Sequence, residues 1–469
     1  MKLAVIGTGW IVGSFIDGLK FAPGFELFAV YSRSRERGEK FAEENGISEV
    51  YTSLDELAAS PAECVYIASP NALHYAQSKR LLESGKHVIC EKPITVTPAE
   101  FSELCELADR NKLVYIEAIM YMHSPVRAKL REALDDIGKV WTAHFDFSQY
   151  SSKYPAYLRG ELPNIFNPAM ATGSLMDLGI YCVYPAVDLF GEPKTVSAVS
   201  SFLESGADAA TAVSMLCKNT AVTMTSCKTG QDYAGSQIIG ERGSIKIGSI
   251  SKLTQAELIM NSGERRIICG GTPKDELMGN EARAFYELIA KPAKNSEKYR
   301  ELRETALSVS RTMQRIRESA GIKFLTEVFT MKYVKTGDVL AVRLDPGEEI
   351  IASVLKIAKD ENIRFAEISA IGAVGRAVFG LYDLNEQKYH SLTFNQPLEL
   401  VSLNGNLSLK DGEPYLHLHA AFADEEGAVI GGHLNEAVIS ATCEMFIRTF
   451  DMDMGRRISE QTGLNIFDI

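Results

Sequence analysis

Lys92 is the first residue of this sequence whose type and position could do chemistry. It lies in Glu91-Lys92-Pro93, directly after a short apolar run at residues 87–90. The run predicts a buried strand, and the carboxyl end of a strand in a parallel sheet is where such folds place ligand-binding and reactive groups. A lysine there can donate or accept the proton on a substrate oxygen. The alternative is a lysine that only forms a surface salt bridge.

Asp177 and Tyr181 are a second pair of candidates. They lie in the apolar stretch 171–190, which predicts a long helix, and their spacing of four residues places them on one helix face. A carboxylate and a phenol on an otherwise apolar helix could face a substrate. The alternative is an acid at the start of the helix and a tyrosine that caps the core, and the residues alone favour this structural role.

Three histidines near the end of the chain could bind a metal. His417 and His419 alternate with leucines, so on a strand they point to the same side, and His433 follows two glycines. Three imidazoles suit zinc or another divalent cation, and no cysteine lies among them. The sequence therefore predicts a metal site here, with ordinary core or surface histidines as the alternative.

The first strand and its glycine turn organise the chain around these groups. Residues 2–6 predict a buried strand, and Gly7 and Gly9 follow it before an apolar-periodic helix. The glycines permit a tight turn and close approach of a pyrophosphate, which the free N–H groups of the helix can bind. Val12 stands where the strict fingerprint has glycine or alanine. We predict a dinucleotide site, with a purely structural turn as the alternative.

The end of the second predicted strand, residues 26–31, bears on the choice of cofactor. Ser32 and Arg33 follow it, Arg37 comes one turn later, and positions 32 to 35 contain no acid. An acid there binds the ribose hydroxyls of NAD, whereas serine and arginine can bind the 2′-phosphate of NADP. NADP is therefore favoured over NAD, and a solvated basic loop is the alternative.

Partial burial beside a positive nicotinamide ring is expected to lower the pKa of Lys92.

The remaining strands of this half carry further candidates. Ser69-Pro70-Asn71 end one of them. Asn71 is expected to cap the next helix, and His74 lies in its first turn, where it could serve the pocket or local packing. The residues expected to bind the cofactor are Gly7, Thr8, Gly9, Trp10, Ile11, Ser32, Arg33, Arg37, Ser69, Pro70, Asn71, His74, Glu91, Lys92 and Glu117.

The pattern of elements predicts three domains. Strands and helices alternate up to residue 122, which is typical of a parallel sheet covered by helices. Short β-runs between residues 195 and 269 then predict an open, mainly antiparallel sheet, followed by helices at 276–290 and 297–319. We expect an α/β dinucleotide-binding domain at 1–122, an α+β substrate domain at 123–324, and a separate small α+β domain at 330–469. A short junction is expected at 321–330.

Composition and charge exclude several classes of function. The chain has 469 residues and a formal net charge of −12, and residues 325–469 have 12 Lys and Arg against 22 Asp and Glu. This charge repels nucleic acid and anionic membranes, so we expect neither as a partner. The eight cysteines form no C-x-x-C pair and are expected to be reduced thiols. With neither a signal peptide nor a membrane span apparent, we expect a cytoplasmic protein.

Six motifs occur in the order and spacing of a known family. GTGWIVG, SRSRER, ASPNALH, CEKP, VYIEAIMY and GSLMDLGIYCV resemble those of the Gfo/Idh/MocA oxidoreductases over residues 1–324. Tyr181 stands where many relatives have histidine, so the branch with dihydrodiol dehydrogenase and glucose-fructose oxidoreductase is the most similar. The resemblance implies a Rossmann domain and NAD(P)-dependent chemistry on a sugar, polyol or cyclic diol. It also implies that Lys92 and Tyr181 transfer the proton, that Asp177 orients substrate hydroxyls, and that the second domain forms a dimer.

The last domain resembles a different family. RLDPGEEI, LHLHAAFADEEGAVIGGHL and ATCEMFI are similar to the PPC (DUF296) domain over residues 330–469. The resemblance implies a compact α+β domain that forms trimers, with the histidine cluster as a candidate metal site. The Arg-Gly-Arg-Pro hook of the DNA-binding plant members does not occur in this sequence. Dimer and trimer contacts together would give a hexamer.

Two other functions remain open at this point. The chain could be a sensor that binds a nicotinamide nucleotide without turnover, although the presence of both Lys92 and Tyr181 favours an enzyme. It could also be bifunctional, with a metal-dependent activity of its own at the three histidines. The zinc content of the protein would separate this possibility from a purely structural last domain.

Overall fold

The computed structural model describes residues 1–324, 332–383, 388–459 and 462–469. The chain folds into two compact units, Met1–Glu327 and Val328–Ile469. The expected junction at 321–330 lies outside the described residues from residue 325 onward, and so does the expected start of the last domain at residue 330.

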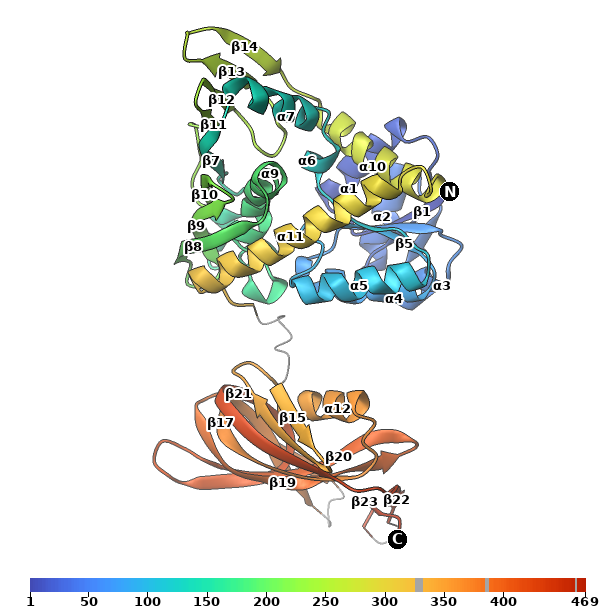
Figure 1. Ribbon diagram of the computed structural model, residues 1–469. Helices are drawn as coiled ribbons and strands as arrows, with labels where there is room; N and C mark the ends of the chain where they lie inside the picture. Colours follow the sequence, from blue (N-terminus) through green and yellow to red (C-terminus); the bar gives the residue numbers. More distant parts are fainter. Residues whose placement is uncertain (325–331, 384–387, 460–461) are drawn as a thin grey trace. The chain divides into compact units, whose positions relative to one another are not determined.

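The first sheet has six parallel strands in the order β3-β2-β1-β4-β5-β6 (Figure 1). Leu3 and Val5 of β1 belong to one buried cluster, and Ala4 and Ile6 belong to another, so the sheet has a core on each face. The strand order reverses at β1 and β4, and the crevice at the carboxyl ends of such strands is the usual ligand site. The strands are β1 (Lys2–Ile6), β2 (Glu26–Tyr31), β3 (Glu49–Tyr51), β4 (Cys64–Ile67), β5 (His87–Glu91) and β6 (Tyr115–Ala118).

Helices cover the two faces of this sheet. Phe15 of the first helix stacks on Tyr66 of β4 with ring centroids 3.8 Å apart. Thr97 and Glu100 form a capping box, which explains where the fifth helix begins. The helices of this domain are α1 (Trp10–Gly18), α2 (Arg35–Asn45), α3 (Leu54–Ala59), α4 (His74–Glu83) and α5 (Pro98–Arg110), with 3₁₀ turns η1 (Leu19–Phe21) and η2 (Asn71–Leu73). Two further helices, α6 (Met120–His123) and α7 (Val126–Ile137), lead to the second sheet, and α7 packs against that sheet.

The second sheet has eight strands in the order β14-β13-β12-β11-β7-β10-β9-β8. Within residues 1–324, β7 and β10 are the one parallel pair of this sheet, and the other neighbours are antiparallel. The strands are β7 (Val140–Ser148), β8 (Pro193–Phe202), β9 (Asp208–Cys217), β10 (Thr220–Cys227), β11 (Ser236–Gly240), β12 (Gly243–Ile247), β13 (Ala256–Met260) and β14 (Arg265–Cys269).

Helices join the two sheets into one unit. The longest, α11 (Ser296–Ala320), packs against β8 and α9 and also against α5 and β6, and Figure 1 shows it crossing from one sheet to the other. α10 (Lys274–Ala290) packs against α1 and α6. The other segments are α8 (Tyr154–Leu158), η3 (Asn164–Phe166), η4 (Pro168–Met170), the π-helical turn η5 (Leu175–Gly179) and α9 (Ile180–Phe190).

The second unit is built on a seven-stranded sheet in the order β15-β16-β21-β20-β19-β17-β18. Because β17 also pairs with β21, the strands β17, β19, β20 and β21 form a closed ring. One helix, α12 (Ile350–Asp360), packs against β20 and β21. The strands are β15 (Lys332–Thr336), β16 (Val339–Leu344), β17 (Ala366–Asp383), β18 (Lys388–Phe394), β19 (Leu398–Lys410), β20 (Glu413–Ala423) and β21 (Val429–Thr449), with a separate pair β22 (Arg456–Ile458) and β23 (Asn465–Phe467).

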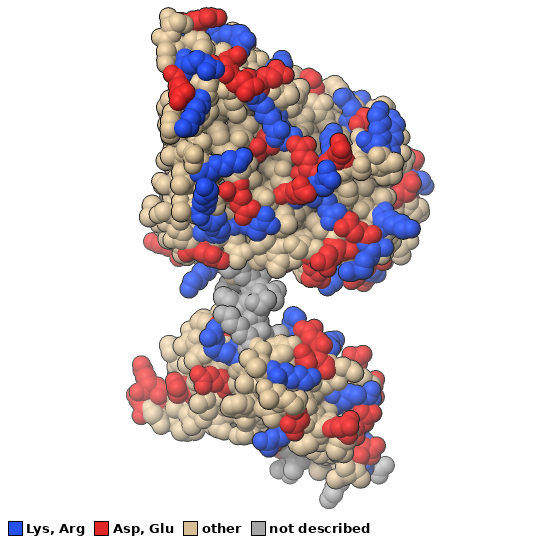
Figure 2. Space-filling view, viewed as in Figure 1, with Lys and Arg blue, Asp and Glu red and all other residues tan. Residues whose placement is uncertain are grey.

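The expected fold class is confirmed in all three of its parts. Six of the eight cysteines are buried, and the other two, Cys227 and Cys269, are partly buried. Among the described residues, no helix has the length and apolarity to cross a membrane. Figure 2 shows acidic and basic side chains interspersed over the visible face of the first unit.

Candidate active site

The glycine turn after β1 has the form that a bound pyrophosphate requires. Gly7 has φ +107°, and a Cβ there would lie 2.9 Å from the carbonyl oxygen of Ala68. Gly9 precedes α1, and a Cβ built on it would meet nothing within 4 Å. The backbone at Gly9 is therefore open on the side where a phosphate could approach the helix N-terminus. The turn fits the predicted nucleotide.

A cavity of about 490 Å³ continues from this turn along the end of β2. Arg33 and Arg37 both line it, and within the part of the chain that the structure describes, neither guanidinium forms an ion pair. The Ser32 hydroxyl donates to the carbonyl oxygen of Ser34 at 2.9 Å. Residues predicted to bind the cofactor that line this cavity are Gly7, Thr8, Ser32, Arg33, Arg37, Ser69 and Pro70.

Asn71 and His74 connect loops around the site. The expectation that Asn71 caps α4 is wrong, because its side-chain amide donates to the carbonyl oxygen of Ala171 at 2.8 Å. His74 is fully buried, and its ring nitrogens lie 2.8 Å from the carbonyl oxygen of Pro93 and 2.9 Å from that of Ser69. The imidazole thus joins the loops after β4 and β5.

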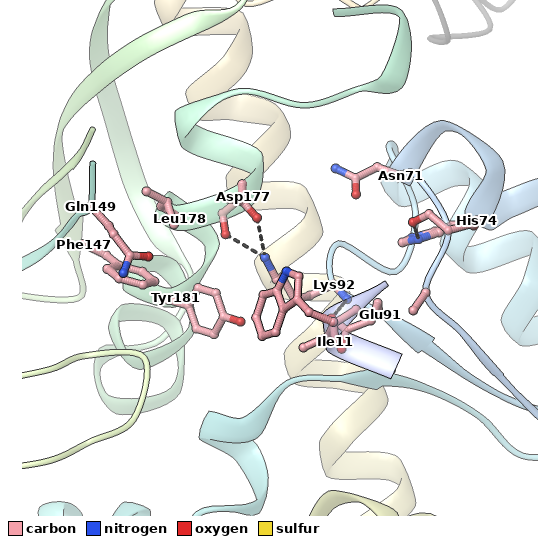
Figure 3. Close-up of a pocket in the computed structure, with 13 residues that line it drawn as sticks. Ile11, Asn71, His74, Glu91, Lys92, Phe147, Gln149, Asp177, Leu178 and Tyr181 are labelled. Carbon is pink, nitrogen blue, oxygen red and sulfur yellow. Dashed lines mark hydrogen bonds and ion pairs between the residues drawn. The ribbon is translucent and has the colours of Figure 1, made fainter. Parts of the chain in front are cut away.

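Lys92, Asp177 and Tyr181 line a second cavity, of about 270 Å³, which shares Ala68 and Ser69 with the first. Lys92 Nζ donates to the Oδ1 atom of Asp177 at 2.9 Å and to its carbonyl oxygen at 2.7 Å. It also lies 4.9 Å from the centroid of the Tyr181 ring. Figure 3 shows Lys92 pointing to Asp177, with Tyr181 beside it. The predicted residues Trp10, Ile11, Asn71, His74 and Glu91 line the same cavity.

Lys228 is a residue of this site that the sequence prediction did not include. It directly follows β10, its side chain is 6% exposed, and its Nζ is paired with Oδ2 of Asp177. Asp177 therefore lies between two ammonium groups, one on each carboxylate oxygen. A lysine at the end of an alternating strand is a weak signal, because no spacing in the sequence relates it to Lys92 or Asp177.

The charges of this cluster shift the pKa of Lys92 in the direction opposite to the predicted one. Burial lowers the pKa of Lys92, but the carboxylate of Asp177 and then the phenol of Tyr181 and Glu91 raise it to a value above the ordinary one. The expectation of a lowered pKa is therefore wrong for this arrangement, because Asp177 at 2.9 Å and the other groups around the ammonium together outweigh burial, which is the largest single effect. Burial raises the pKa of Asp177, yet Lys92 and Lys228 together hold it well below its usual value. At neutral pH Lys92 is therefore protonated and Asp177 is ionised.

The segment carrying Asp177 is not a regular α-helix. Residues Leu175–Gly179 form a π-helical turn, and α9 begins only at Ile180, before Tyr181. The buried carboxylate of Asp208 accepts from the backbone N–H of Leu175 at 2.7 Å and fixes the start of this turn. Wide turns of this kind are frequent at functional sites. The relation of Asp177 to Tyr181 thus differs from the simple helix face that their spacing predicted.

Glu117 lies behind the cavity and not in its lining. Its carboxylate accepts from the backbone N–H of Ile94 at 2.7 Å and from the hydroxyl of Tyr184, and it contributes to neither of the two cavities described above. Burial raises its pKa to about 7. Glu281 is 1% exposed in the same region, and its pKa is raised by burial and by the charges of Glu91 and Glu117. The structure therefore separates Glu117 from the other residues predicted to bind the cofactor.

The second unit brings the three histidines together. His417 and His419 lie on β20, and His419 pairs directly with His433 of β21. One ligand atom from each lies within 4.8 Å of the others, a separation that one metal ion can bridge. Burial, the other two imidazoles and Arg456 lower the pKa of His417 to about 4, so its ring is neutral at pH 7. The Tyr389 hydroxyl donates to the carbonyl oxygen of His433 at 3.0 Å.

Comparison with known families assigns both units. Residues 1–119 match the model described as the oxidoreductase family with an NAD-binding Rossmann fold. Residues 128–246 match the GFO/IDH/MocA C-terminal domain. Residues 331–451 match the Plants and Prokaryotes Conserved (PCC) domain, which is the resemblance given above as PPC.

Individual relatives agree with these matches. The chain is 42% identical over 253 residues to the uncharacterized oxidoreductase YgjR of Escherichia coli, covering 54% of this chain and 77% of that protein. It is 36% identical over 325 residues to the scyllo-inositol 2-dehydrogenase (NADP(+)) IolU of Bacillus subtilis, covering 69% of this chain and 98% of that protein. A levoglucosan dehydrogenase structure in complex with NADH and levoglucosan shares the fold, with a TM-score of 0.59 and 19% identity over 68% of this chain and 97% of that one.

The glycine cradle, the buried lysine at the end of β5 and these matches all indicate one family. The chain belongs to the Gfo/Idh/MocA family of NAD(P)-dependent oxidoreductases and has a PCC domain at residues 331–451.

Proposed function

We propose that this enzyme uses NADP(H) to move a hydride to or from the carbinol carbon of a sugar, polyol or cyclic diol. The observation that carries the proposal is the buried, protonated Lys92 in a cavity that adjoins the glycine cradle. The name of the Bacillus subtilis relative, an NADP⁺-dependent dehydrogenase of scyllo-inositol, supports the same class of substrate. Turnover assays with scyllo-inositol, myo-inositol, D-xylose and a trans-dihydrodiol, each with NADP⁺ and NAD⁺, test it.

A bound nicotinamide dinucleotide supplies the hydride for reduction and accepts it in oxidation. During reduction Lys92 donates its proton to the carbonyl oxygen of the substrate, and during oxidation the neutral amine takes that proton back. Among the described residues the Tyr181 hydroxyl has no hydrogen-bond partner, so it is available to the same oxygen. Both oxygens of Asp177 already accept from lysines. We therefore propose Asp177 as a positioning residue for Lys92, a role different from the orientation of substrate hydroxyls.

A sensor without turnover is the alternative that these assays address. It would bind NADPH and convert none of the four substrates. The geometry favours an enzyme because Asp177 keeps a proton donor charged in the cavity, and binding alone would not need a buried ammonium.

Cofactor selectivity depends on the arginines after β2. Arg33→Gln is expected to raise the Kd for NADPH about tenfold or more and to leave the Kd for NADH unchanged, because a charge-assisted bond to the 2′-phosphate is lost. Fluorescence titration with the two nucleotides measures both constants. Arg35→Gln is the matched control, since Arg35 forms an ion pair with Glu39 and does not line the cavity. Equal losses for NADPH and NADH would contradict the assignment.

We also propose that His417, His419 and His433 bind one zinc or other divalent ion. Three imidazoles in this geometry leave a fourth position open, as in catalytic rather than purely structural sites. Elemental analysis of full-length protein loaded with Zn²⁺ is expected to give one ion per chain, and His433→Ala is expected to lose it. His144→Ala, which alters a histidine of the other unit, is expected to retain it. Full occupancy in His433→Ala would contradict the site.

The assembly proposed for the chain is a homo-oligomer. Val199, Phe202 and Leu216 are exposed on β8 and β9, with 70%, 47% and 38% of their surface accessible, and a second copy of the sheet would cover them. Dimer contacts here and trimer contacts of the PCC domain would combine into a hexamer. Light scattering of the full-length protein measures its mass, and a monomer would contradict this proposal.

A further inference from the structure

A third cavity, of about 380 Å³, adjoins the catalytic one and contains two lysines that the proposed mechanism does not use. It shares Trp10, Phe147, Gln149 and Tyr181 with the catalytic cavity. We propose that the substrate carries a carboxylate or phosphate and that Lys252 and Lys274 bind this anionic group. This inference rests on the proposed function, because it adds a charge requirement to the sugar, polyol or diol.

Lys274 is held in place at the edge of this cavity. It is the first residue of α10, and its Nζ donates to the Ser14 hydroxyl at 3.1 Å and lies 3.8 Å from the centroid of the Trp10 ring. The Trp10 side chain is 74% exposed and lines both cavities. The half-buried ammonium is therefore oriented by two neutral partners, neither of which neutralises its charge.

Lys252 brings a second positive charge to the same cavity. It lies on the loop between β12 and β13, and its charge helps to lower the pKa of Lys274, after burial. Among the described residues neither lysine has a carboxylate within ion-pair distance. Lys252 is exposed and Lys274 is half-buried, and the carboxylate of Glu91, which is not part of the cavity lining, raises the pKa of Lys274. An anion in the cavity would give both ammonium groups a counter-ion.

The acids that line this cavity do not supply that counter-ion. Both carboxylate oxygens of Asp232 accept from backbone N–H groups, those of Ala234 at 2.7 Å and Gly235 at 2.8 Å. Asp146 accepts from the Ser148 hydroxyl at 3.2 Å, and burial raises its pKa. Neither carboxylate forms an ion pair with the lysines, and Oδ1 of Asp146 is buried without a hydrogen-bond partner among the described residues.

The position of the cavity assigns the anion to the substrate and not to the cofactor. The cavity at Arg33 meets the catalytic cavity through Ala68 and Ser69, on the side of the glycine turn. The lysine cavity meets it through Trp10 at the start of α1 and through Phe147, Gln149 and Tyr181 of the second domain. A substrate whose reacting carbon lies beside Lys92 can thus extend toward Lys252 and Lys274, away from the adenosine end of a bound dinucleotide.

The test compares charged and neutral probes of the same shape. The full-length protein is saturated with NADP⁺ and titrated with each probe in a calorimeter. The affinity for D-glucuronate is compared with that for D-glucose, and the affinity for myo-inositol 1-phosphate with that for myo-inositol. At least one anionic probe is expected to bind about tenfold or more tightly than its neutral partner. Which pair shows the difference identifies the anion as carboxylate or phosphate. Equal or undetectable affinities in both pairs would overturn the proposal.

Variants assign the difference to the two lysines. Lys252→Gln with Lys274→Gln is expected to reduce the affinity for the anionic probe to that of the neutral one, with the Kd for NADPH unchanged. Lys246→Gln, an exposed lysine on β12, is the matched control and is expected to bind like the wild type. A weaker Kd for NADPH in the double variant would place the lysines in the cofactor site and overturn the proposal. Because the readout is binding, a failure to turn over any substrate would count against the proposed function alone.

Discussion

Replacement of Lys92 by methionine is expected to lower turnover by at least about a hundredfold, the usual scale for loss of a proton-transfer group. Methionine fills a similar volume but has no proton to give to the substrate oxygen. The fold should persist, because Asp177 keeps its ion pair with Lys228 when Lys92 is removed. The glycine turn and Arg33 are untouched, so the Kd for NADPH should change little. Steady-state rates and a fluorescence titration on the same sample measure the two effects.

The control for this variant is Lys86→Met. Lys86 lies in the same domain and donates to the carbonyl oxygen of Ser60 at 2.7 Å, outside the three cavities described above. Its turnover is expected to equal that of the wild type. Unchanged turnover in Lys92→Met would remove Lys92 from the mechanism, and loss of NADPH binding together with turnover would make it a cofactor ligand.

Substitution of Asp177 by asparagine is expected to affect both stability and activity. The change leaves the ammonium groups of Lys92 and Lys228, whose side chains are 11% and 6% exposed, without a carboxylate between them. Breaking a buried charge pair by removal of one partner costs about 3–5 kcal/mol. We expect a decrease of this size in the free energy of unfolding, measured by urea titration of the full-length protein and assigned to the unfolding transition that NADPH shifts.

The activity of this variant should differ from the wild type in its pH dependence. Asp177 raises the pKa of Lys92, so its loss lets burial lower that pKa. Reduction requires protonated Lys92, and the alkaline limb of the rate profile should therefore move to lower pH. A purely structural role for Asp177 would lower the rate at every pH without moving the limb.

A second substitution separates charge balance from catalysis. Adding Lys228→Met to Asp177→Asn removes one of the two unpaired ammonium groups, so most of the lost stability should return. The shifted pH profile should remain, because Lys92 still lacks its carboxylate. Equal free energies of unfolding for the single and double variants would show that the carboxylate of Asp177 does not compensate the charge of Lys228.

The residue types and local spacing of this sequence determined its fold class. The glycine turn is identified by the strand before it and the helix after it. Both elements are adjacent to the turn in the sequence, so the turn could be predicted without tertiary information. His417 and His419 point the same way because strand side chains alternate, a rule that needs no tertiary information. The family matches confirm both domain resemblances. The roles of Lys92 and Tyr181 and the metal at the histidines stay predictions.

Only the tertiary structure decided how the active-site charges are balanced. Lys228 reaches Asp177 because β10 ends beside the π-helical turn, and no sequence period connects the two positions. The contact of Lys92 with Asp177 likewise depends on packing between domains, and it reversed the expected pKa shift of Lys92, since the effect of burial depends on which charge lies next to the ammonium. Glu117 lies at the end of a strand, as expected, but its carboxylate is bound to Ile94 and Tyr184 behind the cavity. Local patterns predict elements, whereas the partner of each charged side chain depends on long-range packing between domains.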